Sequence, residues 1–244
     1  LCDTDFGLLC DAAHYMSYHD VNGLTPRQVP LPGFSAKWLN MTRLSVICAI
    51  IGNNVTLIKR PTQIDFAYLD PDHAAAHKRH FDSYVIGDEP SLAYIPETII
   101  IVENVDNMRA FPQTVKHGIC VFGHGYTAVA TLSSVDWIRD CDNVLYWGDM
   151  DKDGYAILDS LRATGIDAKS INMGSSTYRI YAKYGTSLDK SSRQMARTPK
   201  KDAENIVNQM QNLTEDEKEA LSLCLHKGSA RRIEQERIPF PEEI

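Results

Sequence analysis

The sequence lacks any long apolar run. Among its 244 residues the longest nearly apolar stretch is 44–51, far shorter than the ~20 residues that cross a bilayer. The first ten residues, LCDTDFGLLC, have no basic segment ahead of their apolar residues, as an export signal would. We therefore expect neither a membrane segment nor export. Because residue 1 is Leu rather than Met, we expect a further segment upstream.

Cysteine pairs and an excess of positive charge are also missing. The six cysteines include no CxxC pair and show no regular spacing, which indicates free thiols in a reducing, cytoplasmic setting. Lys and Arg number 25 against 32 Asp and Glu, and this balance excludes a uniformly basic nucleic-acid coat. With 43% hydrophobic residues, a disordered tail is excluded as well. The length allows one large domain or two small ones with a real core.

The first ninety residues show mixed patterns. Apolar spacing predicts a helix over 35–51, with Ser35 as its N-cap and Gly52 at its end. We expect a short strand over 64–69 and a polar helix over 73–81 to follow.

From residue 98 on, apolar runs of strand length alternate with helical segments. Such alternation is typical of an α/β fold with a parallel sheet covered on both faces by helices. The expected strands and helices are 98–102, 104–110, 119–123, 125–139, 143–148, 154–163 and 168–173. Closing helices are expected towards the end, with a capping box at Thr214 and Glu217 and a last helical segment over 229–238.

Positive charge gathers in residues 162–201. This stretch holds nine basic and two acidic side chains, a net charge of +7, so the rest of the chain carries -14. Three tyrosines interleave with it, which suits a segment that grips a phosphate backbone, although a solvated surface explains the stretch equally well. The predicted DNA-contacting side chains are Arg179, Lys183, Arg193, Arg197 and Lys200.

Acidic residues follow two of the expected strands. Glu103 comes directly after 98–102, while Asp149 and Asp151 come directly after 143–148, with Gly154 opening the next helix. At ~4 Å and an effective dielectric of ~20, each pair of these charges would cost about 4 kcal/mol. A cation between them would remove this cost, and carboxylate oxygens suit a hard divalent ion such as Mg or Mn. Glu103 would then be the natural proton donor or acceptor.

The segment DMDKDG (149–154) has other interpretations. As an EF-hand loop it would need a bidentate Glu where Ser160 stands. As a phosphatase nucleophile motif it would need Thr or Val where Gly154 and Tyr155 stand. A simple helix cap and surface turn is the commonest role of an isolated DxD, but this role does not explain Glu103.

A Glu after one strand, a further strand, and DxDxxG after a third resembles the Toprim domain of topoisomerases, primases and related nucleases. The DxDxxG form is most similar to that of Spo11 and the topoisomerase VI A subunit. The blocks FAYLDP, IIIVENVDNMRAFP, VFGHGY, LYWGDMDKDGYAILDSLRATG and RRIEQERIP are also similar to the C-terminal region of JetD, the Wadjet anti-plasmid defence nuclease subunit of the DUF2220 family. This resemblance covers about residue 30 to the end.

The resemblance implies a Mg- or Mn-dependent DNA endonuclease, a hydrolase that cuts plasmid DNA with SMC-like complex subunits and usually forms a homodimer. Glu103, Asp149 and Asp151 match the Toprim acids, and Glu234 and Glu236 are weaker candidates for a second metal site.

The resemblance also implies three parts: an N-terminal mixed α/β segment (1–92), a Toprim-like (Rossmann-like) catalytic domain (93–190) and a C-terminal helical extension (191–244). Lys152 and Asp153 depart from the Thr-His pair usual in the family. The winged-helix part that such proteins carry upstream is not evident here. The alternative function is a non-catalytic DNA-binding or assembly module of the same complex.

Smaller signals have ordinary explanations. His124, between Gly123 and Gly125, is expected in a tight turn, although a phosphate contact at a helix start is an alternative. Trp147 is expected in the core. His73, His77 and His80 have helical spacing, but the sequence offers no nearby fourth ligand for zinc.

Overall fold

The computed structural model describes residues 3–59, 61–123, 125, 128–189, 191–195, 198–226, 228–242 and 244. The chain forms two compact units, Leu1–Pro61 and Thr62–Ile244. The predicted acidic site lies in the second unit. The three-part division expected from the sequence stays a prediction.

The first unit is built on two helices, α1 (Asp3–Tyr18) and α2 (Met41–Ile51), that pack against each other. The predicted start of α2 at Ser35 was wrong. Asn40 is the N-cap, because its extended backbone lets its side chain accept a hydrogen bond from Arg43 N. The predicted end is confirmed: Gly52 takes the left-handed conformation with φ 67°. The unit has a small core of its own, which includes Leu9, Ala12, Met16, Leu44 and Ile47.

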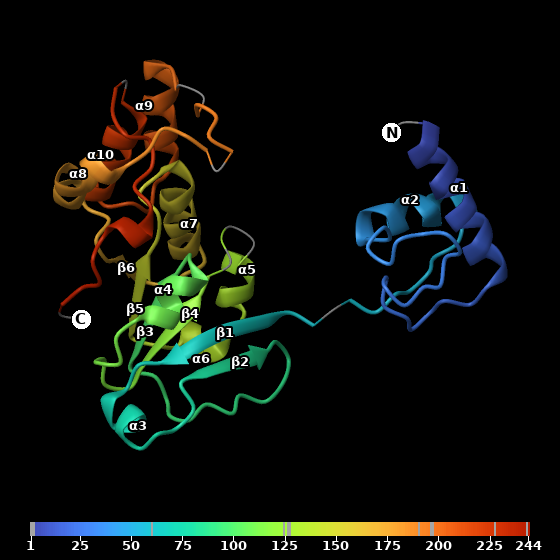
Figure 1. Cartoon of the computed structure of the whole chain (residues 1–244), viewed down its shortest axis with the longest axis horizontal. Helices are drawn as coiled ribbons and strands as arrows, with labels where there is room; N and C mark the ends of the chain where they lie inside the picture. The colour runs from blue at the N-terminus through green and yellow to red at the C-terminus, as the bar shows by residue number, and fades with distance from the viewer. Residues whose placement is uncertain are drawn as a thin grey trace. The chain divides into compact units, whose positions relative to one another are not determined.

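The second unit is organised around a six-stranded sheet in the order β2-β1-β4-β3-β5-β6 (Figure 1). The strands are β1 (Gln63–Tyr68), β2 (Phe81–Val85), β3 (Thr98–Val102), β4 (Gly118–Phe122), β5 (Asn143–Trp147) and β6 (Ala168–Ser170). The neighbours from β4 to β6 pair in parallel, as predicted. β1 pairs antiparallel with both β2 and β4, so the sheet is mixed rather than purely parallel.

The predicted helix over 73–81 was wrong. Only one short helix forms, α3 (Pro71–Ala75), which Asp70 caps by accepting a hydrogen bond from His73 N. His77 has φ 51°, a conformation that no continuing helix allows. The chain therefore leaves the helix and enters β2.

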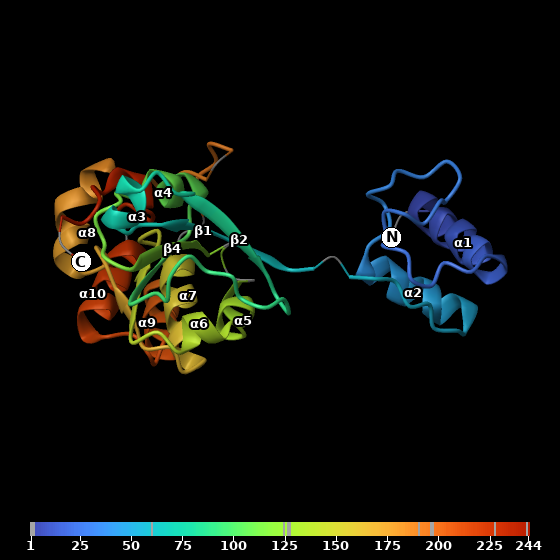
Figure 2. The same cartoon turned by 90° about the horizontal axis from the view of Figure 1, so that it is seen from below.

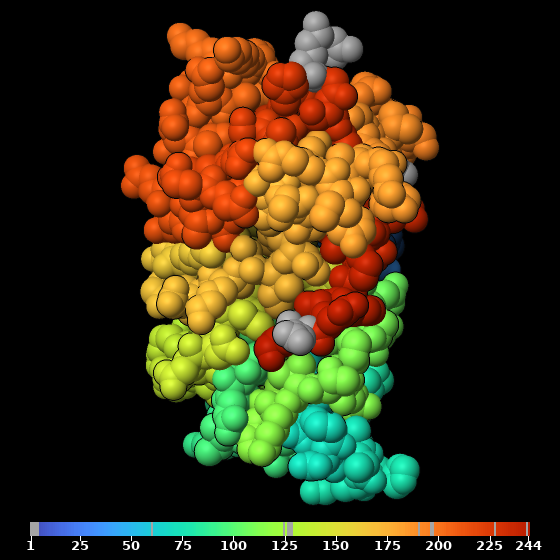
Figure 3. Space-filling model, turned by 90° about the vertical axis from the view of Figure 1, so that its left-hand side faces the viewer, coloured from blue at the N-terminus to red at the C-terminus, as the bar shows by residue number. Residues whose placement is uncertain are grey.

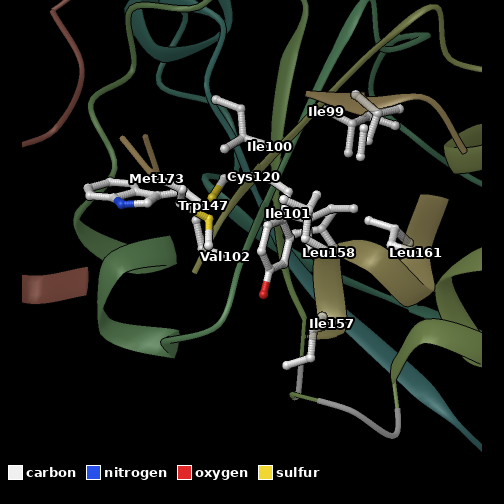
Figure 4. Close-up of a cluster of buried hydrophobic side chains, with 14 of the residues drawn as sticks. Ile99, Ile100, Ile101, Val102, Cys120, Trp147, Ile157, Leu158, Leu161 and Met173 are labelled. Carbon is white, nitrogen blue, oxygen red and sulfur yellow. The ribbon is translucent and has the colours of Figure 1, made fainter. Parts of the chain in front are cut away.

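Helices cover both faces of the sheet. Figure 2 shows α3 and α4 (Val105–Ala110) on one face, and α5 (Ala128–Ser133), α6 (Asp136–Arg139) and α7 (Lys152–Ala163) on the other. The run Ile99–Val102 is buried throughout because both faces of β3 are covered. Figure 4 shows Ile99 and Ile101 on the side of Leu158 and Leu161 of α7, with Ile100 and Val102 on the side of Trp147. Trp147 is buried in the core, as predicted.

The remaining helical elements follow β6 in the chain: α8 (Ser175–Tyr181), η2 (Ala182–Tyr184), α9 (Lys200–Gln209), α10 (Glu215–Leu225) and η3 (Gln235–Arg237). The capping box of Thr214 and Glu217 at the start of α10 is confirmed.

Of the predicted helix over 229–238, only the short η3 at Gln235–Arg237 forms, and the rest of the prediction was wrong. Arg232 bridges to Thr186 and Ile233 to Met150, and these backbone hydrogen bonds replace those of a helix. The segment continues to Phe240, whose ring lies 5.2 Å from that of Phe111. Figure 3 shows this red C-terminal segment lying against the green part of the chain.

In the part of the chain that the structure describes, no helix is both long and apolar enough to cross a membrane.

Candidate functional site

The site lies where β3 and β5 end side by side. Val102 pairs with Trp147 in the parallel register, so Glu103 and Gly148 leave the sheet at the same edge. A Cβ atom added to Gly148 would lie less than 3.0 Å from Oε1 of Glu103, and one added to Gly154 would lie 3.1 Å from it. The Glu103 carboxylate therefore lies over two glycines that leave room for it.

Tyr146 holds the Glu103 carboxylate. Its hydroxyl donates a hydrogen bond to Oε1 of Glu103 at 2.5 Å. The pKa of Glu103 is raised to about 7: burial is the largest cause, the Tyr146 hydrogen bond opposes it, and the charges of Asp149 and Asp151 add to it. Sequence reasoning missed Tyr146, because an aromatic residue within an apolar strand is usually core.

Asp151 is the N-cap of α7. Its Oδ1 accepts hydrogen bonds from the backbone amides of Asp153 and Gly154, both at 2.9 Å. Among the interpretations of the DMDKDG segment, the helix cap therefore accounts for the hydrogen bonds of Asp151 Oδ1. Oδ2 of Asp151 remains for other partners, and the Asp151 side chain is 8% exposed.

A residue of the C-terminal segment holds the Asp149 carboxylate in place. Its Oδ1 accepts a hydrogen bond from the Gln235 amide at 2.8 Å. The pKa of Asp149 is raised to about 6. Burial is the largest cause; the Gln235 amide and the Arg232 charge oppose it, while the charges of Asp151 and Glu236 add to it. Ionised carboxylates at this site are thus disfavoured by burial and by one another.

Arg232 neutralises part of this charge. Its Nε lies 2.5 Å from Oδ2 of Asp151 and 3.7 Å from Oδ2 of Asp149. Gln235, three residues further along the chain, is fully buried, and both polar atoms of its side-chain amide lack a hydrogen-bond partner among the described residues. Sequence reasoning considered only the two glutamates of RRIEQERI and missed both residues, since only the fold brings this segment to the strand ends.

The two weaker metal candidates lie differently. Glu236 accepts a hydrogen bond from Asn104, the residue after Glu103, so it reaches the edge of the site. Glu234 instead pairs with Arg237 and is 45% exposed. Their contribution to a second metal site stays a prediction.

The donor set has the chemistry that a hard divalent cation needs. Glu103, Asp149 and Asp151 offer only carboxylate oxygens, and the first two carry raised pKa values that a nearby cation would lower. In the arrangement seen here, however, no group of three or more His, Cys, Asp or Glu among the described residues is placed to hold a metal ion. Arg232 occupies the place beside the two aspartates that a cation would need.

The raised pKa of Glu103 predicts a pH-dependent stability effect. The folded pKa of about 7 lies above the reference value of 4.5, so the wild-type protein loses stability as pH rises through this window, whereas the amide of a Glu103→Gln variant would not titrate. The metal-free variant is expected to gain about 1–3 kcal/mol over wild type at pH 8, and little at pH 4. Urea unfolding in a chelator at both pH values measures this, and an equal difference at both would contradict the shifted pKa.

Four of the five predicted DNA-contacting side chains are described by the structure, and these four already have protein partners. Arg179 pairs with Glu219, Arg193 with Asp189 and Lys200 with Glu204, while Lys183 lies 4.9 Å from the Tyr184 ring centre. Arg197 lies outside the described residues. Lys200 also lines a hollow of ≈ 740 Å³ between α9 and the end of α10, whose lining does not include Glu103, Asp149 or Asp151. The role of these side chains in DNA binding stays a prediction.

The minor histidine signals have local explanations. His73 is buried, and its Nε2 lies 2.7 Å from the Arg79 carbonyl oxygen. His124 lies outside the described residues, while Gly125 next to it has φ 69°, as a tight turn requires.

Comparison with known proteins adds a family assignment. No curated protein matches the chain. The family model described as Wadjet protein JetD, C-terminal, matches residues 56–243. This match takes in nearly the whole second unit, including both strand ends and the C-terminal segment. The chain therefore belongs to the family of the C-terminal region of the Wadjet protein JetD, which implies a role in the Wadjet anti-plasmid system with an SMC-like complex as partner.

Proposed function

We propose that the chain is a Mg- or Mn-dependent DNA endonuclease subunit of Toprim type. It would hydrolyse phosphodiester bonds of double-stranded plasmid DNA together with its SMC-like partner, as a homodimer in the cytoplasm. Family membership supports the plasmid-directed role. Support for the nuclease chemistry comes from the site.

One observation carries the proposal: the partly buried carboxylates of Glu103 and Asp149, both with raised pKa values, lie with Asp151 at the ends of two adjacent parallel strands. Placing like charges close together away from water is costly unless a proton or a cation compensates them. Perturbed carboxylates of this kind are characteristic of functional sites. A bound divalent cation would polarise a phosphoryl oxygen and activate water there.

The protein's own residues would have separate roles. Asp149 and Asp151 would hold the cation. Glu103, with a pKa near neutrality, would accept or donate a proton at its carboxylate. Tyr146 would keep that carboxylate in position through its hydrogen bond.

DNA would be bound mainly through phosphates. Arg179, Lys183, Arg193 and Lys200 lie in the basic stretch 162–201, and phosphates would have to compete with their present partners. Such binding weakens steeply as salt rises. With an overall charge of -7, a metal ion, a second protomer or the partner complex would have to supply further affinity.

A second candidate function is a DNA-binding or assembly module without catalysis. Two observations favour it: Arg232 already compensates the aspartates, and the described residues contain no assembled three-residue metal group. Binding of Mn²⁺ separates the candidates, because a scaffold has no need of the ion.

The test of the proposed function is cleavage of supercoiled plasmid in Mn²⁺ by wild-type and Glu103→Ala protein. Both should be combined with the SMC-like partner subunits, because a defence nuclease must be restrained when alone. We expect the wild-type protein to cleave the supercoiled plasmid and the Glu103→Ala variant to leave it intact. Equal cleavage by both would contradict the role of Glu103, and no cleavage by wild type in the complete complex would favour the assembly module.

A further inference from the structure

Backbone hydrogen bonds hold the main chain of Arg232, whereas its side chain is partly exposed. Its carbonyl oxygen accepts a hydrogen bond from Thr186 N at 2.8 Å, and its own amide donates one to Thr186 O at 3.0 Å. The next residue, Ile233, exchanges a similar pair of hydrogen bonds with Met150. The Arg232 side chain, in contrast, is 30% exposed. Its guanidinium can therefore leave the aspartates by side-chain rotation alone.

Asp151 has only one oxygen to share. Oδ1 is engaged by two amides at the start of α7, so a cation would have to approach Oδ2, the atom that Arg232 contacts. A guanidinium and a divalent ion at this oxygen would repel each other strongly at such short range. The Arg232 guanidinium and the metal ion therefore cannot both occupy the position beside Asp151 Oδ2.

We propose that Arg232 is a built-in counter-cation that competes with the divalent metal for Asp149 and Asp151 and is displaced when the metal binds. This inference rests on the proposed metal site. In the metal-free protein Arg232 limits the repulsion between the buried Asp151 and the partly buried Asp149. In the metal-bound protein it turns towards solvent, so the apparent metal affinity is reduced by the strength of its ion pair.

Calorimetric titration with Mn²⁺ tests the competition. Arg232→Ala removes the competitor and is expected to bind Mn²⁺ roughly 10- to 100-fold more tightly, since hydrogen bonds to charged groups are worth about that much. Arg232→Lys keeps the charge and should stay closer to wild type. The matched control is Arg237→Ala, because Arg237 carries the same charge in the same segment but pairs with Glu234; its affinity should not change.

A second measurement covers the case in which Arg232→Ala unfolds without metal. In wild-type protein the Arg232 Nε–H resonance, assigned by its absence in Arg232→Lys, should move to the position of a solvent-exposed arginine when Mg²⁺ is added. A resonance that stays in place although Mg²⁺ binds would overturn the inference.

The outcomes separate the inference from the metal site. If Arg232→Ala binds Mn²⁺ no more tightly than wild type, Arg232 does not compete with the metal ion. Binding of Mn²⁺ by the wild-type protein would still support the proposed metal site. If neither wild type nor Arg232→Ala binds Mn²⁺, the proposed metal site fails and the inference fails with it.

Discussion

Replacing Glu217 by alanine is expected to destabilise the second unit by about 3–5 kcal/mol, because it leaves a largely buried cation without its partner. Arg162 donates to both carboxylate oxygens of Glu217, at 2.6 and 2.9 Å. Ser170 and the Thr214 amide donate to the same carboxylate. The side chains of Glu217 and Arg162 are only 3% and 14% exposed, so water cannot readily replace the lost bonds.

Thermal unfolding measures this effect. For a unit of this size the loss corresponds to a fall in Tm of about 6–20 °C. The matched control is Glu215→Ala in the same helical turn, whose side chain is 91% exposed and pairs with Lys218. It should change stability by less than about 0.5 kcal/mol. Similar losses in both variants would show that the Glu217 network contributes no more than a surface pair.

The Glu217 effect should also depend on pH. Burial alone would raise the pKa of Glu217, but hydrogen bonds from Arg162, Ser170 and Thr214 outweigh burial and lower it below its reference value of 4.5. A lowered folded pKa stabilises the protein above the unfolded pKa, and this contribution is lost as pH falls through the folded pKa. The difference between wild type and Glu217→Ala should therefore shrink in acid.

Asp149→Ala is expected to abolish Mn²⁺ binding and to slow DNA cleavage by about 10³-fold or more, because a metal's electrostatic contribution of several kcal/mol would be lost. The variant should remain folded, since the pKa of Asp149 is raised to about 6, chiefly by burial, and its charge is disfavoured in the folded state.

The matched control for this variant is Asp153→Ala, which removes an exposed acid from the first turn of α7, four residues further along the chain, and should bind Mn²⁺ as wild type does. Calorimetry on the three proteins gives the answer. Indistinguishable titrations of wild type and Asp149→Ala would exclude Asp149 as a ligand, whatever the cleavage assay shows.

Local patterns predicted most of the central sheet. The β-branched run in β3 and the alternation with helices identified the parallel strands, because burial on both faces leaves a continuous apolar stretch. The capping box of α10 was visible because its signal spans only four residues. The antiparallel strand β2 was missed, since histidines with helical spacing masked a turn at His77.

The acidic site was predicted only in part. Glu103, Asp149 and Asp151 could be identified because parallel strands place their carboxyl ends at one edge, and their role in binding a metal stays a prediction. Arg232 and Gln235 could not be identified from the sequence, because the charged and amide side chains of RRIEQERI are equally typical of a solvated helix. Their role arises from tertiary contacts with Asp149 and Asp151, which no local pattern encodes.

The hydrogen bonds that close the acidic site join residues 81 and 86 positions apart. Contacts of such long range form late, since a large loop must first be ordered. During synthesis the β3 and β5 ends emerge well before Arg232 and Gln235 leave the ribosome. Until the segment that carries these two residues docks, the aspartates lack both their bridging arginine and their anchoring amide, so the protein leaves their charges uncompensated.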